Sequence, residues 1–133
     1  MLFGPEHVRR YVETDGAEGH EWQGTQVLLL TTKGRRSGEQ RTTPLIYGRH
    51  GEDYLIVGSK GGADQPPAWL LNLEADPEVQ LQVLGDRFRA HARLAGAQEK
   101  PELWQTMVGH WPAYDDYQAK TSRDIPVVVL ERE

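Results

Sequence analysis

Cysteine is absent from this sequence of 133 residues, which excludes disulfides, thiolate metal sites and cysteine nucleophiles. Long apolar runs are also missing. The longest, Val27–Leu30, has the length of a strand, whereas a membrane-spanning helix needs roughly 20 apolar residues. Residues 1–10 lack the basic-then-apolar order of a signal peptide. We therefore expect a cytoplasmic protein without an integral membrane segment, at most peripheral to a membrane.

Histidine offers no pattern of metal ligands. The five histidines are scattered over the chain, and no two of them have the i, i+4 spacing of a helical metal site. With thiolates excluded as well, we expect no bound metal. No set of serine, histidine and acid can be assembled from the order of the residues, so a hydrolase triad is not predicted.

Positive charge is scarce overall but concentrated in one place. The net charge of −5 argues against a nucleic-acid partner bound by bulk electrostatics. Four cations nevertheless lie within nine residues: Lys33, Arg35, Arg36 and Arg41. Only Glu39 opposes them there. A local basic patch on an acidic chain is typical of a site for one anionic ligand.

Strand patterns dominate the chain. Six segments have the alternating or β-branched composition of strands: residues 25–32, 42–47, 53–57, 79–83, 87–94 and 125–130. Helices are expected over residues 5–14, 68–74 and 101–108, with a further short one from Pro112. The strands follow one another as hairpins rather than as βαβ units. This order predicts one mainly β (α+β) domain over residues 1–133, an antiparallel barrel with short helices, in which residues 1–22 form an N-terminal helix and loop.

The first candidate site is the basic turn between two predicted strands, residues 31–44. Gly34 and Gly38 allow the backbone to curl and expose N–H groups, and arginine offers a planar fork that matches phosphate or carboxylate. The glycine-to-lysine spacing differs from that of a P-loop, and no helix follows. The pattern indicates either an anion site or a solvated hairpin tip.

Three further segments could surround a ligand. Residues 58–63 form a glycine-rich loop with Ser59 and Lys60, which suits close approach of a planar ligand or an ordinary flexible turn. Residues 67–73 predict a short helix whose Trp69 packs into the core. Residues 111–117 carry three aromatic side chains that could wall an apolar pocket, and tyrosine can donate a proton to a developing anion. Ordinary packing of a short helix is the alternative for this last segment.

Together these segments, in this order, resemble the deazaflavin-dependent nitroreductase family. The resemblance runs from about residue 23 to residue 131 and includes Asp76-Pro77 and the closing Thr121, Arg123, Ile125 and Pro126. It implies a split β-barrel of the FMN-binding type that binds coenzyme F420, a deazaflavin with a phosphodiester and a polyglutamate tail. The implied reaction is hydride transfer from the reduced coenzyme to a small electrophilic acceptor such as a quinone, an enone or a nitro compound.

The resemblance also implies roles for individual residues. The implied catalytic donors are Tyr117 and Ser59, and the implied acceptor-binding residues are Trp111, Tyr114 and Tyr117. The implied cofactor-binding residues are Lys33, Gly34, Arg35, Arg36, Ser37, Gly38, Arg41, Thr43, Pro44, Lys60, Gly61, Gly62, Ala63, Trp69 and Asn72. The sequence departs from the family at Trp111, where tyrosine or phenylalanine is frequent, and at Lys120, where a further aromatic is frequent. The far end of the acceptor side is therefore less aromatic here.

Two alternatives stay open at the level of sequence. One is a split-barrel reductase that uses FMN, although a single phosphate needs fewer cations than this turn provides. The other is a protein that binds the coenzyme without turnover. A homodimer is a further expectation, with the predicted hairpin Val79–Leu94 as a candidate surface.

Overall fold

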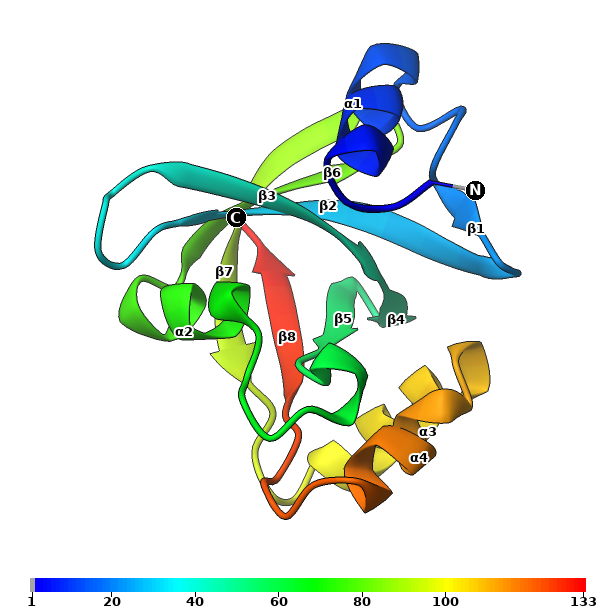
Figure 1. Ribbon diagram of the computed structural model, residues 1–133, viewed down its shortest axis with the longest axis vertical. Coiled ribbons are helices and arrows are strands. Elements are labelled where there is room, and N and C mark those ends of the chain that lie inside the picture. Colours follow the sequence, from blue (N-terminus) through cyan, green and yellow to red (C-terminus); the bar gives the residue numbers. More distant parts are fainter. Residues whose placement is uncertain (1) are drawn as a thin grey trace.

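The computed structural model describes residues 2–133, which are built around one curled antiparallel sheet (Figure 1). Its eight strands are β1 (Glu21–Trp22), β2 (Thr25–Lys33), β3 (Gln40–Ile46), β4 (Gly48–His50), β5 (Asp53–Val57), β6 (Glu78–Val83), β7 (Asp86–Leu94) and β8 (Val127–Arg132). The hydrogen-bonded order is β1-β2-β6-β7-β8-β5-β4, and β3 pairs with β2. Every pairing is antiparallel, as the hairpin pattern predicts. The sheet curls into a half-barrel, so the predicted split-barrel fold is confirmed.

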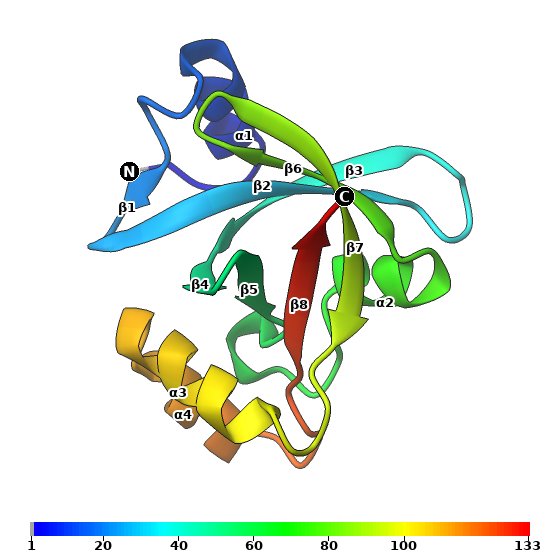
Figure 2. The same cartoon turned by 180° about the vertical axis from the view of Figure 1, so that it is seen from behind.

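Short helices cover the two ends of this sheet. The helices of residues 2–133 are α1 (Gly4–Thr14), α2 (Ala68–Ala75), α3 (Lys100–His110), α4 (Ala113–Ala119) and the 3₁₀ turn η1 (Lys60–Gly62). Pro5 and Pro101 occupy the first turns of α1 and α3, where the missing N–H has no partner to lose. Figure 2 shows α1 at one end of the half-barrel and the pair α3–α4 at the opposite end. No helix in this part of the chain is long and apolar enough to cross a membrane.

The β6–β7 hairpin shows how the sequence sets the register. Val83 pairs with Asp86 across the turn, and Leu81 pairs with Phe88. The alternation therefore places Val79 and Leu81 on the buried face together with Ala90. Pro44 lies in β3, which among the described strands pairs only with β2 and therefore forms an edge of the sheet, where a residue without an N–H is tolerated.

The sequence missed two short strands and placed the start of the final strand too early. Strands β1 and β4 were not expected, because elements of two and three residues carry no measurable alternation. The final strand begins at Val127 rather than at residue 125. The N–H of Ile125 donates to the side-chain carbonyl of Gln118 at 2.9 Å, and Pro126 has no N–H to offer a neighbouring strand.

The core has three separate clusters, of which the smallest packs Tyr11 of α1 against Val27 and Leu29 of β2. The two larger ones position the elements around the site. One fills the half-barrel and includes Leu30, Ile56 and Leu130. The other packs α3 and α4 against β5 and β8 through Leu103 and Met107. The second cluster fixes α4, which carries the aromatic segment singled out from the sequence, against the rest of the sheet.

Candidate functional site

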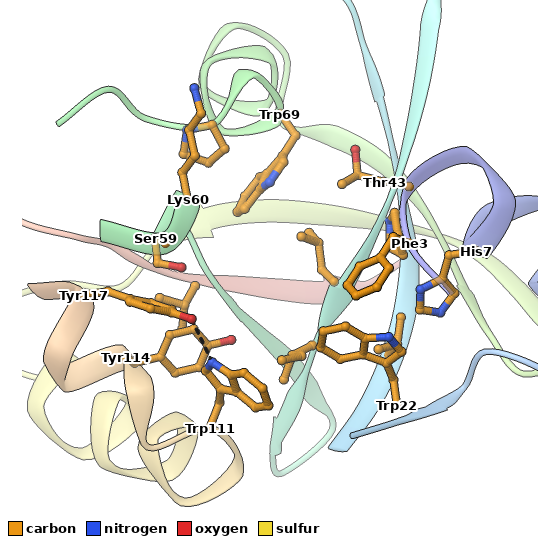
Figure 3. Close-up of a pocket in the computed structure, with 18 of the residues that line it drawn as sticks. Phe3, His7, Trp22, Thr43, Ser59, Lys60, Trp69, Trp111, Tyr114 and Tyr117 are labelled. Atoms are coloured by element: carbon orange, nitrogen blue, oxygen red, sulfur yellow. Dashed lines mark hydrogen bonds between the residues drawn. The ribbon is translucent and has the colours of Figure 1, made fainter. Parts of the chain in front are cut away.

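A cavity of about 450 Å³ lies between the N-terminal segment, strand β3, the η1 loop and helix α4 (Figure 3). We call it the aromatic cavity, because its lining includes the rings of Phe3, Trp22, Trp69, Trp111, Tyr114 and Tyr117. Ser59, Lys60 and Thr43 also line it and supply polar atoms. Such a lining suits a flat, largely apolar ligand with a few polar groups.

A second pocket of about 630 Å³ adjoins the first. We call it the basic pocket, because Arg35, Arg36 and Arg41 line it together with Gly34, Ser37 and Asn72. Thr43 and Trp69 line both spaces. The two therefore lie next to one another, and one elongated ligand could place a planar group in the aromatic cavity and anionic groups among the arginines.

The β2–β3 turn that carries these arginines is closed by its own backbone. The Gly34 N–H donates to the Glu39 carbonyl at 2.7 Å, and the Gly38 N–H donates to the Gly34 carbonyl at 2.8 Å. Gly38 has a φ of +75°, which a residue with a Cβ adopts at a cost. Among the residues that the structure describes, Arg41 is paired only with Glu39, at 3.3 Å, and both side chains are more than half exposed. An exposed pair of this kind is weak, so an incoming anion can compete for Arg41.

Asn72 holds this turn from helix α2. Its side-chain oxygen accepts hydrogen bonds from the Arg35 N–H at 3.2 Å and from Arg35 Nη1 at 3.1 Å. Its Nδ2 donates to Thr32 Oγ1 at 3.2 Å, and the side chain is only 4% exposed. Most of the hydrogen-bonding capacity of Asn72 is thus used inside the protein, and its contribution to the basic pocket is to fix Arg35.

Lys33 and Gly38, both predicted to bind the cofactor, lie elsewhere. They line a separate polar hollow that also includes Asp76 and Glu78. The structure does not bring Lys33 into the basic pocket with the three arginines. Clustering along the sequence does not determine on which side of a hairpin a charge lies. Pro44, in contrast, lines the aromatic cavity.

The glycine-rich loop reaches the aromatic cavity through Ser59, Lys60 and Gly61. Three successive residues have positive φ: Lys60 (+45°), Gly61 (+64°) and Gly62 (+84°). A Cβ on Gly62 would lie 2.7 Å from the Tyr117 carbonyl oxygen, so this glycine permits the loop to pack directly on α4. Gly62 and Ala63 do not line the cavity, and their contribution is made through the backbone.

Helix α4 supplies the two tyrosines of the neighbouring wall (Figure 3). The indole N–H of Trp111 donates to the Tyr117 hydroxyl at 3.2 Å, and the Tyr114 and Tyr117 rings meet edge to face at 6.1 Å. Tyr114 is only 5% exposed, and burial raises the pKa of its hydroxyl well above the usual range. Tyr114 therefore stays neutral at ordinary pH and acts as a wall of the cavity.

Sequence reasoning missed the N-terminal wall. Trp22 Nε1 donates to the Leu2 carbonyl at 2.9 Å, and the Phe3 ring meets the Trp22 ring edge to face at 5.7 Å. On its other side the Trp22 ring lies 5.9 Å from that of Trp111 (Figure 3). The only available signal was a tryptophan between Gly19 and Gly24 in a segment otherwise interpreted as a loop.

Comparison with known families and proteins agrees with this geometry. A family model described as F420H(2)-dependent quinone reductase matches residues 4–132. An F420H(2)-dependent quinone reductase of Mycobacterium tuberculosis strain H37Rv is 42% identical over 130 residues, which cover 95% of this chain and 87% of that protein.

Solved structures give the same picture. A structure of an F420-H2 dependent reductase is similar at a TM-score of 0.73 and 36% identity, covering 79% of this chain and 93% of the other. A structure described as a domain-swapped dimer has a TM-score of 0.76 and 34% identity, covering 95% of both chains. An FAD-binding protein of Mesorhizobium loti, at 14% identity and a TM-score of 0.57, shares the fold alone.

Proposed function

This chain belongs to the family of F420H(2)-dependent quinone reductases, and on that premise we propose that it transfers a hydride from reduced coenzyme F420 to a quinone. The observation that carries the proposal is the junction of the aromatic cavity and the basic pocket at Thr43 and Trp69. A coenzyme with a planar ring at one end and several anionic groups at the other requires such a combination.

The residues present fit coenzyme F420. Arg35, Arg36 and Arg41 offer planar guanidinium forks that match a phosphodiester and the carboxylates of a polyglutamate tail. Trp69 and the Ser59–Gly61 backbone, which line the aromatic cavity, would hold the ring. FMN carries one phosphate and leaves part of this positive charge unused, which makes it the second choice. When bound, the reduced coenzyme supplies the hydride.

The protein has to supply a proton to the acceptor. Addition of a hydride to a quinone leaves negative charge on an oxygen, and a proton on that oxygen completes the hydroquinone. We assign this proton to the Tyr117 hydroxyl. Because an indole N–H can only donate, Tyr117 accepts the bond from Trp111 and keeps its own hydrogen for another acceptor. The Ser59 hydroxyl, which lines the same cavity, is a second donor. The aromatic walls exclude water from the transfer.

Acceptors with other chemistry, such as enones and nitro compounds, need the same hydride and the same proton. The exposed side chain of Lys120, directly after α4, lies close to the proposed donor, with its Nζ 5.8 Å from the centre of the Tyr117 ring. The acceptor side is therefore polar next to Lys120, and we rank quinones above nitroaromatic compounds as substrates.

A homodimer is part of the proposal. Support comes from the 34%-identical structure described as a domain-swapped dimer, which matches 95% of this chain. The β6–β7 hairpin remains our candidate for the dimer surface, since Leu84 at its turn is 45% exposed. Sedimentation of the purified protein measures whether it forms a dimer, and the same measurement on Leu84→Asp tests whether the hairpin is the dimer surface.

The proposed function is tested by titrating the protein with oxidised F420, followed by ligand fluorescence, with FMN run in parallel at equal ionic strength. We expect tight, salt-sensitive binding of F420. Arg36→Gln should weaken it, whereas Arg9→Gln should not, because Arg9 lies on α1 and pairs with Glu6 and Glu13. Turnover of F420H2 with a soluble quinone then separates a reductase from a mere carrier. Preference for FMN would contradict the cofactor assignment, and binding of neither would remove the proposal.

A further inference from the structure

Arg123 makes an unusual set of contacts beside the aromatic cavity. Its Nε donates to the Ala63 carbonyl at 2.9 Å, and its Nη2 donates to the carbonyls of Gly58 at 3.0 Å and Ser59 at 2.8 Å. Within residues 2–133 no carboxylate lies at ion-pair distance from it. One guanidinium therefore joins the beginning and the end of the glycine-rich loop through the backbone alone.

The loop needs such support. Lys60 stands at a φ of +45°, a conformation that its Cβ disfavours, and the two following glycines are also left-handed. Inside the loop, the Gly62 N–H donates to the Ser59 carbonyl at 2.9 Å and the Ala63 N–H donates to the Lys60 carbonyl at 3.2 Å. A strained segment persists only where the surrounding structure holds it in place, and the three bonds from Arg123 do so.

Arg123 is itself held by helix α4. Gln118 Nε2 donates to the Arg123 carbonyl at 2.8 Å, and Gln118 Oε1 accepts from the Ile125 N–H at 2.9 Å. Gln118 directly follows Tyr117, the proposed proton donor. Gly62, in the loop, packs directly against the backbone of Tyr117. The loop, the segment after α4 and the helix are thus bound together.

We propose that Arg123 is a positioning residue that locks the Gly58–Ala63 loop and helix α4 into one unit. In this unit the polar groups of the loop, Ser59 and Lys60, keep a fixed separation from Tyr117. The inference rests on the proposed function for the identity of the ligand, but the lock is a property of the chain without ligand. A lysine cannot replace Arg123, because a single ammonium cannot reach carbonyls at both ends of the loop.

The first test uses the ligand-free protein. Amide hydrogen exchange is measured by NMR for the wild type, Arg123→Lys and Arg123→Gln, with Arg132→Gln as the control. Arg132 is an exposed arginine that pairs with Asp86 away from the loop. Loss of two of the three hydrogen bonds should speed exchange at Gly62 and Ala63 about tenfold or more, while paired amides of β6 and β7 stay unchanged. Unchanged exchange at Gly62 and Ala63 in both Arg123 variants would overturn the inference.

The second test uses coenzyme binding. Arg123→Lys should weaken F420 binding about tenfold, with the control equal to the wild type. In Arg123→Ala, millimolar guanidinium should restore binding, whereas equal sodium chloride should not. If guanidinium does not restore binding and the loop amides exchange at the wild-type rate, Arg123 does not hold the loop and α4 together.

If the wild type binds no F420, the proposed function fails, and the exchange measurement still shows whether Arg123 holds the loop. If the Arg123 variants do not fold, Gln118→Met releases Arg123 without removing it and gives the same comparison.

Discussion

The indole N–H of Trp111 donates a hydrogen bond to the hydroxyl oxygen of Tyr117 over 3.2 Å. This bond links the segment between α3 and α4 to the residue that we propose as proton donor. It fills one acceptor position of the phenol oxygen, so the tyrosine hydrogen is directed elsewhere. Trp111 thereby combines two tasks: it walls the aromatic cavity and it orients Tyr117.

Tyr117→Phe should lower kcat with a quinone about 100-fold, the usual scale for loss of a positioned proton donor. Binding of F420 should stay within twofold of the wild type, because the ring is retained. Steady-state kinetics and a fluorescence titration measure the two quantities. Unchanged turnover would eliminate Tyr117 as the donor.

Trp111→Phe removes the N–H but keeps an aromatic wall. We expect kcat to fall about fivefold, the value of one hydrogen bond. In a Tyr117→Phe background the same change should have no effect on kcat, since its target is gone. An equal fall in kcat in the wild-type and Tyr117→Phe backgrounds would mean that Trp111 lines the cavity but does not orient Tyr117.

Asn72→Ala should weaken F420 binding about tenfold and destabilise the protein by about 1–3 kcal/mol, because Thr32 and the Arg35 N–H lose a buried partner. Calorimetric titration and urea denaturation give the two values. Gln105→Ala, a truncation of an exposed amide on α3, is the control and should change neither. Wild-type affinity in Asn72→Ala would show that the turn keeps its shape without help from α2.

Gly62→Ala should destabilise the protein by about 3 kcal/mol or more, since a positive φ and a Cβ at 2.7 Å from the Tyr117 carbonyl oxygen act together. Gly61→Ala has the same kind of backbone strain but open space around its Cβ, so its cost should be about 1–2 kcal/mol. Urea denaturation of both variants makes the comparison. Equal costs would refute the close contact between the loop and α4.

The contribution of His20 to stability should fall as the pH drops below about 6.5, its ordinary pKa. Burial lowers the pKa of this side chain, which is 9% exposed and hydrogen-bonded through Nε2 to the Tyr47 hydroxyl at 2.8 Å. The unfolded chain then binds the proton first, so the contribution of His20 is complete above the unfolded pKa and is lost as the pH falls towards the folded one. His91 titrates in the opposite sense, since its partner Glu78 raises its pKa. Urea denaturation at pH 7.5 and 5.5 should therefore show a smaller difference for His20→Gln than for the wild type.

The sequence predicted the paired strands well, because alternation in segments such as Val79–Val83 is a local property. It predicted the aromatic residues of α4 and the arginines of the turn as parts of one site only through resemblance. For two residues, Lys33 and Arg123, the sequence did not reveal the surroundings that the structure shows. Lys33 was grouped with the arginines because neighbours in sequence were assumed to be neighbours in space. Arg123 received no role because its partners are backbone carbonyls, one of them 60 residues earlier, which no side-chain pattern reveals.

The bond from Trp22 to the Leu2 carbonyl bears on how the protein should be produced. Residues 2 and 3 line the aromatic cavity, which we assign to the coenzyme ring and the acceptor, so an affinity tag fused in front of them would lie next to this cavity. The other terminus is attached to the sheet, where the Glu133 N–H donates to the Arg89 carbonyl at 3.0 Å. Neither Arg89 nor Glu133 lines the aromatic cavity, so a tag placed after Glu133 is the better arrangement for kinetic comparisons between variants.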